Sequence, residues 1–234
     1  MVKGRCIGLI GGLGVGAAVH YYSSLAQRHK ERGISLDLVM AHADVGRGFA
    51  YMQAGDRDGL ANYLNGFMHR LKAAGAEVAV IPAVTPHSCV RELLAISPLP
   101  LLSIFDPLAE ELSARSIQKV AVFGTRFVVE SGLFGMVHGV EIVRPTPEEV
   151  EYIHDTYMEL VDHGEASEER CRGLTNLALT LCRRDGVEAI VLAGTDFASM
   201  FNTDKTNFPH LDCAALHLRA IMNSLCEGMP LDGF

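Results

Sequence analysis

The sequence predicts an α/β protein built from two pseudo-symmetric halves. Short runs of β-branched and other apolar residues alternate with segments of helical periodicity, which is typical of βαβ units and parallel sheets. One strand pattern also occurs twice. Ala83 lies eight residues after Gly75, Gly194 lies eight residues after Gly186, and a threonine follows each within two positions. We therefore expect two three-layer α/β/α halves with parallel sheets and one cleft between them.

The predicted strands are short and apolar, and several end at glycine, proline or a polar residue. Residues 78–81 are the clearest case, because four apolar residues stop at Pro82 and polar residues follow soon after. Such a run indicates a buried parallel strand whose carboxyl end points into a site. The expected strands cover residues 6–10, 36–42, 78–81, 99–104, 119–124, 140–144 and 189–193.

The predicted helices follow these strands and begin at recognisable caps. Thr146 and Glu149 form a capping box with Pro147 at the first helical position, and Ser167 caps the next helix. Residues 44–55 are expected to form a loop, because Gly46 and Gly48 interrupt them. The expected helices cover residues 17–32, 56–74, 88–96, 107–115, 125–137, 147–162, 168–184 and 212–226.

The domain boundary is expected near residues 97–106. The last helix is expected to return to the first half, which gives one domain from residues 1–100 plus 210–234 and another from residues 101–209. The composition stays uniform along the chain, so the halves should pack closely.

The bulk composition is that of an ordinary globular protein. The chain has 234 residues, of which 49% are hydrophobic and 21% charged. Its net charge of −8 argues against nucleic acid or an anionic membrane as a partner. Apolar runs stay below the about 20 residues that span a bilayer. The start of the chain lacks the pattern of a signal peptide. We expect a cytoplasmic protein.

The six cysteines are scattered without a C-x-x-C pair, and the ten histidines show no metal-ligand spacing. Reduced, mostly buried thiols and no metal site are therefore expected. Cys89 and Cys213 are interpreted as packed thiols. Each nevertheless lies close to a predicted helix start, where a thiolate would be favoured.

A glycine-rich turn follows the first strand. Gly12, Leu13 and Gly14 belong to a G-x-G-x-x-G/A pattern. Dinucleotide binding would also require an acidic residue at the end of the second strand. Asp37 begins that strand and Asp44 lies too far along, so no nucleotide cofactor is expected. The unpaired N–H groups of such a turn suit a carboxylate as well as a phosphate.

Polar residues at four strand ends are further candidates for ligand binding. Arg47 is either a solvated surface arginine or a clamp for a carboxylate. Thr85, Thr125 and Thr195 would each be ordinary helix caps if considered alone. Three threonines at equivalent places around one cleft favour binding of an anion or carboxylate.

Two titratable residues lie near the same strand ends. His87 is either a loop or capping histidine or a catalytic base. Asp196 either caps the helix that follows it or receives an ammonium group of a ligand.

Four motifs occur in a fixed order, at residues 7–14, 82–87, 193–196 and 211–217. Together they resemble the motifs of the cofactor-independent aspartate/glutamate racemase superfamily, over essentially the whole chain. The resemblance implies an active site between the halves, where one thiol from each half moves the α-proton of an amino acid. It also implies a small amino acid or carboxylate as ligand, no pyridoxal phosphate or other cofactor, and allows a homodimer.

In this chain Ala83 and Gly194 stand at the two positions that the resemblance assigns to catalytic thiols, and Val84 replaces a family asparagine. Two-thiol racemisation is then not expected. Three hypotheses remain: an isomerase or lyase with altered chemistry, a silent carboxylate-binding homologue, or an engineered variant with a native cysteine changed to Ala83. The small residues are also expected to enlarge the cleft.

Overall fold

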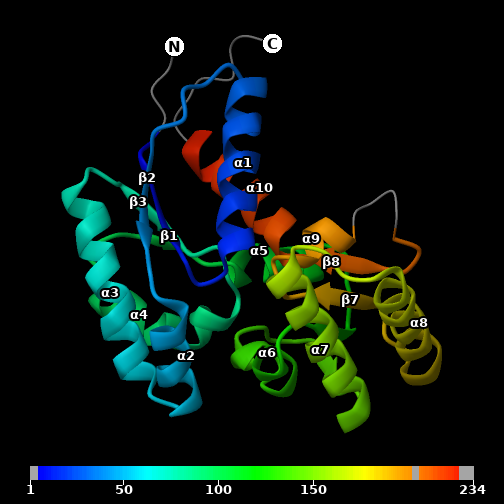
Figure 1. The fold of residues 1–234 in the computed structure, drawn as a ribbon. Coiled ribbons are helices and arrows are strands. Elements are labelled where there is room, and N and C mark those ends of the chain that lie inside the picture. The colour runs from blue at the N-terminus through cyan, green and yellow to red at the C-terminus, as the bar shows by residue number, and fades with distance from the viewer. Residues whose placement is uncertain (1–4, 202–205, 227–234) are drawn as a thin grey trace.

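The computed structural model describes residues 5–201 and 206–226. The chain forms two four-stranded sheets in which every pairing is parallel (Figure 1). The first sheet has the order β2-β1-β3-β4 and the second the order β6-β5-β7-β8. The same strand order in both sheets confirms the predicted α/β fold with two similar halves.

The strands are short and lie close to their predicted ranges, apart from β8, which was not expected. The first sheet consists of β1 (Ile7–Gly11), β2 (Leu38–His42), β3 (Val78–Val80) and β4 (Leu101–Leu102). The second consists of β5 (Lys119–Phe123), β6 (Glu141–Val143), β7 (Ala189–Leu192) and β8 (His210–Asp212). All residues of β1, β3 and β7 are buried, which explains their continuous apolar sequences.

Helices cover both faces of each sheet. Those of the first half are α1 (Val15–Glu31), α2 (Val45–Gln53), α3 (Arg57–Ala73), the 3₁₀ helix η1 (Thr85–Cys89) and α4 (Val90–Ile96). The others are α5 (Phe105–Ala114), α6 (Arg126–Glu130), the 3₁₀ helix η2 (Leu133–Gly135), α7 (Pro147–His163), α8 (Glu168–Asp185), α9 (Phe197–Met200) and α10 (Cys213–Cys226).

Strand β1 shows how one strand supplies two cores. Ile10 packs in a cluster with Leu64 of α3 on one face of the sheet. Ile7 packs with Leu25 of α1 and Leu218 of α10 on the other face. Side chains of a strand alternate between the two faces, so the strand is apolar throughout and separates two layers of helices.

The predicted caps of α7 and α8 are confirmed. The Thr146 hydroxyl accepts a hydrogen bond from the backbone N–H of Glu149, whose carboxylate accepts one from the backbone N–H of Thr146. Ser167 caps α8 by accepting from the N–H of Arg170 at 3.3 Å. These three bonds fix the starts of the two helices, which border the second sheet.

The predicted loop over residues 44–55 is wrong, because α2 occupies most of it. Asp44 caps this helix by accepting from the N–H of Arg47 at 2.9 Å. Gly48 is buried in this helix, and a methyl group on it would be in ordinary contact with Leu13 Cδ2 at 3.4 Å, in the turn after β1. The glycines that predicted a loop are therefore accommodated within a capped helix.

Two predicted helices also have different bounds. The helix expected over residues 125–137 ends at Glu130, because Gly132 adopts a left-handed conformation and η2 follows. The helix expected from residue 88 is preceded by η1 and becomes α-helical at Val90. Helix α9 was not predicted. Its residues 197–200 make a single turn too short for a periodic signal.

Helix α10 packs against both α1 and α5 and so bridges the halves. The division into residues 1–100 plus 210–234 and residues 101–209 remains a prediction. The strand pairings place β4 in the first sheet and β8 in the second. No helix among the described residues is both long and apolar enough to cross a bilayer.

Candidate functional site

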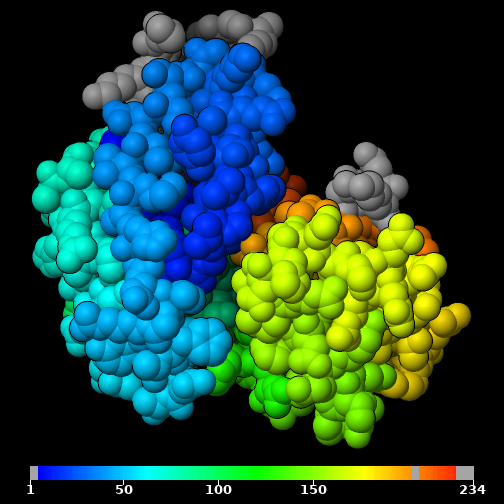
Figure 2. All heavy atoms as spheres, viewed as in Figure 1, coloured from blue at the N-terminus to red at the C-terminus, as the bar shows by residue number. Residues whose placement is uncertain are grey.

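A cavity of about 240 Å³ lies between the two halves, beyond the carboxyl ends of the central strands. Figure 2 shows the halves as two lobes with a crevice between them. The first half contributes the turn after β1 with the start of α1, helix α2 and the segment after β3. The second contributes α7 and the segments after β5 and β7. The lining residues are Gly12, Leu13, Gly14, Val15, Gly16, Val45, Phe49, Met52, Ala83, Val84, Thr85, Pro86, Thr125, Tyr157, Met158, Val161, Ala193, Thr195 and Asp196.

Most of this lining is apolar. Its polar side chains are three threonines, Tyr157 and Asp196. None of the described residues that line the cavity is Lys, Arg or His. A bound carboxylate would therefore depend on hydroxyl groups and backbone N–H groups.

The three predicted threonines do meet around this cavity. The hydroxyl oxygens of Thr85 and Thr125 lie 3.3 Å apart and join the two halves. The Thr195 hydroxyl donates to the carbonyl oxygen of Pro82 at 3.3 Å, which is a second link between the halves. Thr125 also accepts from the N–H of Val128 as the cap of α6.

Asp196 lies at the centre of the contact between the halves. The Tyr157 hydroxyl donates to its Oδ2 atom at 2.9 Å. Its carboxylate also accepts a hydrogen bond from the backbone N–H of Ala17, in the first turn of α1. The positive end of α1 thus holds a carboxylate of the chain itself. The expectation that Asp196 caps the following helix is wrong, because within the described chain α9 has no side-chain cap.

Burial changes the proton affinity of both groups. Burial raises the pKa of the Asp196 carboxyl, although the hydrogen bonds from Tyr157 and Ala17 oppose that rise. Burial raises the pKa of Tyr157 well above its ordinary range, and the negative charge of Asp196 is the second cause of this rise. Tyr157 is therefore a neutral donor, and Asp196 is the group in the cavity whose protonation moves toward neutral pH.

Positions 83 and 194 differ in what surrounds them. Ala83 lines the cavity, as does Val84. Gly194 has no open space beside it, since a methyl group placed there would lie 2.2 Å from Tyr157 Cε2. The expectation that both small residues enlarge the cleft is therefore wrong at Gly194, where the Tyr157 ring fills the space that a side chain would need.

His87 does not line the cavity. Its Nε2 atom accepts from the N–H of Ile104 at 3.4 Å, so its Nδ1 atom carries the proton and donates to the carbonyl oxygen of Ala83 at 2.8 Å. Burial lowers the pKa of His87 to about 4. The neutral ring therefore fixes the backbone at Ala83 and faces away from a ligand in the cavity.

Arg47 also lies outside the cavity lining. Its guanidinium carbon is 5.0 Å from the centroid of the Tyr63 ring, a cation–π contact at the surface of the first half. This contact agrees with the interpretation of Arg47 as a surface arginine rather than a clamp for a carboxylate.

The two thiols near helix starts are buried. Burial raises the pKa of Cys89 to about 12, and its Sγ atom donates to the carbonyl oxygen of Pro86. Burial and the charge of Asp212 also raise the pKa of Cys213. Neither group is a thiolate at neutral pH. Across residues 5–201 and 206–226, no three His, Cys, Asp or Glu side chains gather as a metal ion would need.

Sequence reasoning missed Tyr157, the largest polar side chain of the cavity. It lies on the apolar stripe of α7, four residues after the buried Ile153, and so has the spacing of an ordinary core residue. Phe49 and Met52 were missed for another reason, since they lie in the segment that was predicted as a loop.

Comparison with known proteins gives a family match over most of the chain. Residues 10–221 match the model of the Asp/Glu/hydantoin racemases. The structure of a candidate Asp/Glu racemase from Yersinia pestis has a TM-score of 0.81 and 26% identity, covering 94% of this chain and 99% of that one. An aspartate racemase homologue from Pyrococcus horikoshii OT3 has a TM-score of 0.78 and 23% identity, covering 94% and 99%.

A more distant structure contains a ligand. The glutamate racemase from Francisella tularensis subsp. tularensis SCHU S4, in complex with D-glutamate, has a TM-score of 0.64 and 12% identity. The match covers 100% of this chain and 85% of that one. At this identity the likeness shows a shared fold.

Proposed function

Because the chain belongs to the Asp/Glu/hydantoin racemase family, we propose that its cavity between the halves binds a small amino acid or a related small carboxylate. The hydroxyls of Thr85, Thr125 and Thr195 supply donors for a carboxylate, together with N–H groups of the turn at residues 12–14. Asp196 supplies the opposite charge for an ammonium group. These complementary ends favour a zwitterion over a dicarboxylic acid, for which the described lining offers no cation.

The proposed reaction is not symmetric racemisation by two thiols. Inversion of a carbon without a cofactor needs a base on one face and an acid on the other. Ala83 and Gly194, at the two positions that the resemblance assigns to thiols, carry no titratable group. We infer an isomerase or lyase reaction in which a proton moves on one face only.

The observation that carries this inference is the hydrogen-bonded pair of Tyr157 and Asp196 beside Gly194. These are the only titratable side chains among the described residues of the cavity lining. Asp196 takes the proton from the α-carbon of the ligand as its carboxylate becomes a carboxylic acid, and the electron pair of the broken C–H bond is delocalised into the ligand carboxylate, which the threonine hydroxyls stabilise. Asp196 then returns a proton to the same face of the α-carbon. Tyr157 stays protonated throughout and positions the acceptor oxygen.

Exchange of the α-proton in deuterated water tests this proposal. We expect at least one member of a panel of amino acids and related carboxylates to gain deuterium at its α-carbon, measured by NMR. Asp196→Asn should lower the exchange rate by about 10²–10⁴-fold, the usual contribution of a general base. Asp155→Asn, which changes an exposed acid on α7, is the matched control and should exchange at the unchanged rate. Equal rates in Asp196→Asn and the unchanged protein would contradict the role of Asp196.

A silent carboxylate-binding protein is the second candidate, favoured by the two hydrogen bonds that already hold the Asp196 carboxylate. Calorimetric titration with the same panel separates the two candidates. Binding without deuterium uptake in any compound supports the silent protein, and deuterium uptake excludes it.

The hypothesis that Ala83 replaces a native cysteine has its own test. The Ala83 methyl group lines the cavity, so a thiol at this position would reach the ligand. The hypothesis predicts that Ala83→Cys gains α-proton exchange, measured in the same deuterium assay. Position 194 still lacks an acid, so exchange should proceed with retained configuration. Absence of any gain in a folded Ala83→Cys protein removes support for this hypothesis.

A further inference from the structure

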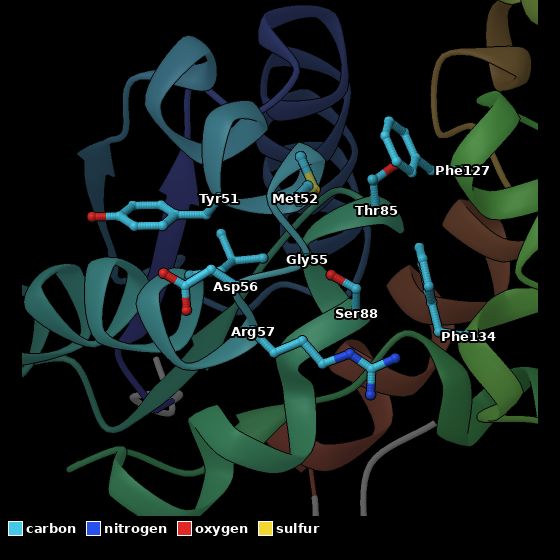
Figure 3. Close-up of a pocket in the computed structure, with 10 residues that line it drawn as sticks. Tyr51, Met52, Gly55, Asp56, Arg57, Thr85, Ser88, Phe127 and Phe134 are labelled. Atoms are coloured by element: carbon cyan, nitrogen blue, oxygen red, sulfur yellow. The ribbon is translucent and has the colours of Figure 1, made fainter.

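A second cavity, of about 150 Å³, lies between the same two halves. Among the described residues it shares only Met52 and Thr85 with the larger cavity, and its other lining residues lie on α2, α3, η1, α6 and η2 or in the α2–α3 turn. Figure 3 shows this cavity with side chains of both halves around it. Its residues are Tyr51, Met52, Gly55, Asp56, Arg57, Leu60, Thr85, Ser88, Phe127 and Phe134.

The cavity contains a cation that no described carboxylate neutralises. Arg57 begins α3, and in the described chain its guanidinium takes part in no ion pair or hydrogen bond. The neighbouring Asp56 is exposed, as Arg57 is, and also lines the cavity. Its carboxylate accepts from the N–H of Gly59 at 2.8 Å and forms no ion pair with Arg57 among the described residues. In Figure 3 the Arg57 side chain extends toward Phe134, below Ser88. An anion is therefore the complementary ligand at this end of the cavity.

A hydroxyl group lines the same cavity as this cation. Ser88 is half-buried in η1, and no described group hydrogen-bonds to its hydroxyl. Thr85 supplies another hydroxyl from the previous turn, at the border with the larger cavity. A carboxylate on Arg57 would thus find a neutral donor within the same lining.

The opposite wall is aromatic and is held in an unusual backbone conformation. Leu133 and Phe134 have φ angles of 55° and 57°, left-handed values that cost non-glycine residues about 1–3 kcal/mol each. Leu133 is fully buried in a core cluster of the second half, which anchors the segment next to Phe134. The adjacent Phe134 ring faces the cavity, as does Phe127 of α6. The strained segment therefore places an aromatic wall opposite Arg57.

We propose that this smaller cavity is a separate binding site for an arenecarboxylate, with the carboxylate on Arg57 and Ser88 and the ring against Phe127 and Phe134. A cavity of about 150 Å³ is large enough for a benzene ring. The proposed site is distinct from the cavity in which α-proton exchange is proposed, because Asp196, Tyr157 and Ala83 do not line it.

Calorimetric titration of the full chain with benzoate tests this proposal. We expect benzoate to bind more tightly than benzamide, which has the ring without the charge, and than acetate, which has the charge without the ring. Arg57→Gln should weaken benzoate binding by at least about tenfold, the loss expected for a hydrogen bond to a charged group. Arg57→Gln should leave benzamide binding unchanged.

Two control variants make the result specific. Arg91→Gln removes an exposed arginine of α4 that does not line the cavity, and benzoate affinity should stay the same. Asp196→Asn changes the larger cavity and should also leave benzoate affinity the same, so failure of the exchange reaction does not affect this test. Equal affinity for benzoate and acetate, no benzoate binding, or no effect of Arg57→Gln in a protein with unchanged circular dichroism would each overturn the proposal.

Discussion

At the scale of single residues, Gly194 and Tyr157 are complementary in shape. A methyl group at position 194 would lie 2.2 Å from the Tyr157 ring, so the two cannot coexist without movement. We expect Gly194→Ala to lower the free energy of unfolding by about 1–3 kcal/mol, the usual effect of overpacking a buried site. Urea unfolding followed by circular dichroism measures this change.

The matched double variant separates packing from other effects. Tyr157→Leu removes the ring that fills the space, so Gly194→Ala should destabilise the Tyr157→Leu protein much less than the unchanged protein. Additive losses in the double variant would show that the two positions do not compete for the same space. A cysteine introduced at position 194 would meet the same obstacle.

The sequence predicted three threonines of the cavity lining from their places a few residues after strand ends. Thr85, Thr125 and Thr195 were predicted in this way, because carboxyl ends of parallel strands share one edge of a sheet. Arg47 and His87 also follow strand ends but contact the Tyr63 ring and backbone groups instead. Side-chain direction is set by packing between segments, and a strand pattern does not report it.

At the scale of elements, the clearest local signals predicted the structure well. The capping box at Thr146 defines the start of α7 because both of its bonds form between residues three apart. Helix α2 was missed for the opposite reason. Its glycines have low helix propensity, yet Asp44 caps the helix and Gly48 packs near Leu13 of the turn after β1. Tertiary packing thus outweighed local propensity in a segment that borders the cavity.

At the scale of the whole molecule, the repeated strand pattern predicted two equivalent sheets but not how they are joined. The contacts between the halves pair residues that are far apart in sequence, as when Thr195 donates to Pro82. Asp196 similarly reaches the first turn of α1. Such single polar contacts produce no periodic pattern in the sequence. The arrangement of the two halves relative to each other is therefore not predictable from sequence periodicity.

A buried pair of histidines predicts how the whole fold responds to acid. His217 of α10 donates from Nε2 to the carbonyl oxygen of Leu102 and accepts from the Tyr21 hydroxyl at Nδ1. Burial lowers its pKa to about 3 and that of His87 to about 4. Both rings are therefore neutral in the folded protein at pH values where an unfolded chain binds protons.

The direction of the effect follows from this difference in proton binding. The stabilising contribution of each neutral ring is fully present above the unfolded pKa of about 6.5 and is lost as pH falls toward the folded pKa. Between pH 7 and 4.5 the loss should be about 2 kcal/mol for each ring. Asp196 and Asp212, whose pKa values burial raises, act in the opposite direction, so variants must be compared with the unchanged protein.

His217→Gln isolates one of these contributions. Glutamine offers an amide near the same partners and does not titrate, so the variant should lose about 2 kcal/mol less than the unchanged protein between pH 7 and 4.5. Urea unfolding at both pH values measures the difference. The exposed His138 provides the control, since His138→Gln should leave the acid dependence unaltered. An identical acid dependence in the His217→Gln and His138→Gln proteins would mean that the buried ring is not what couples this fold to pH.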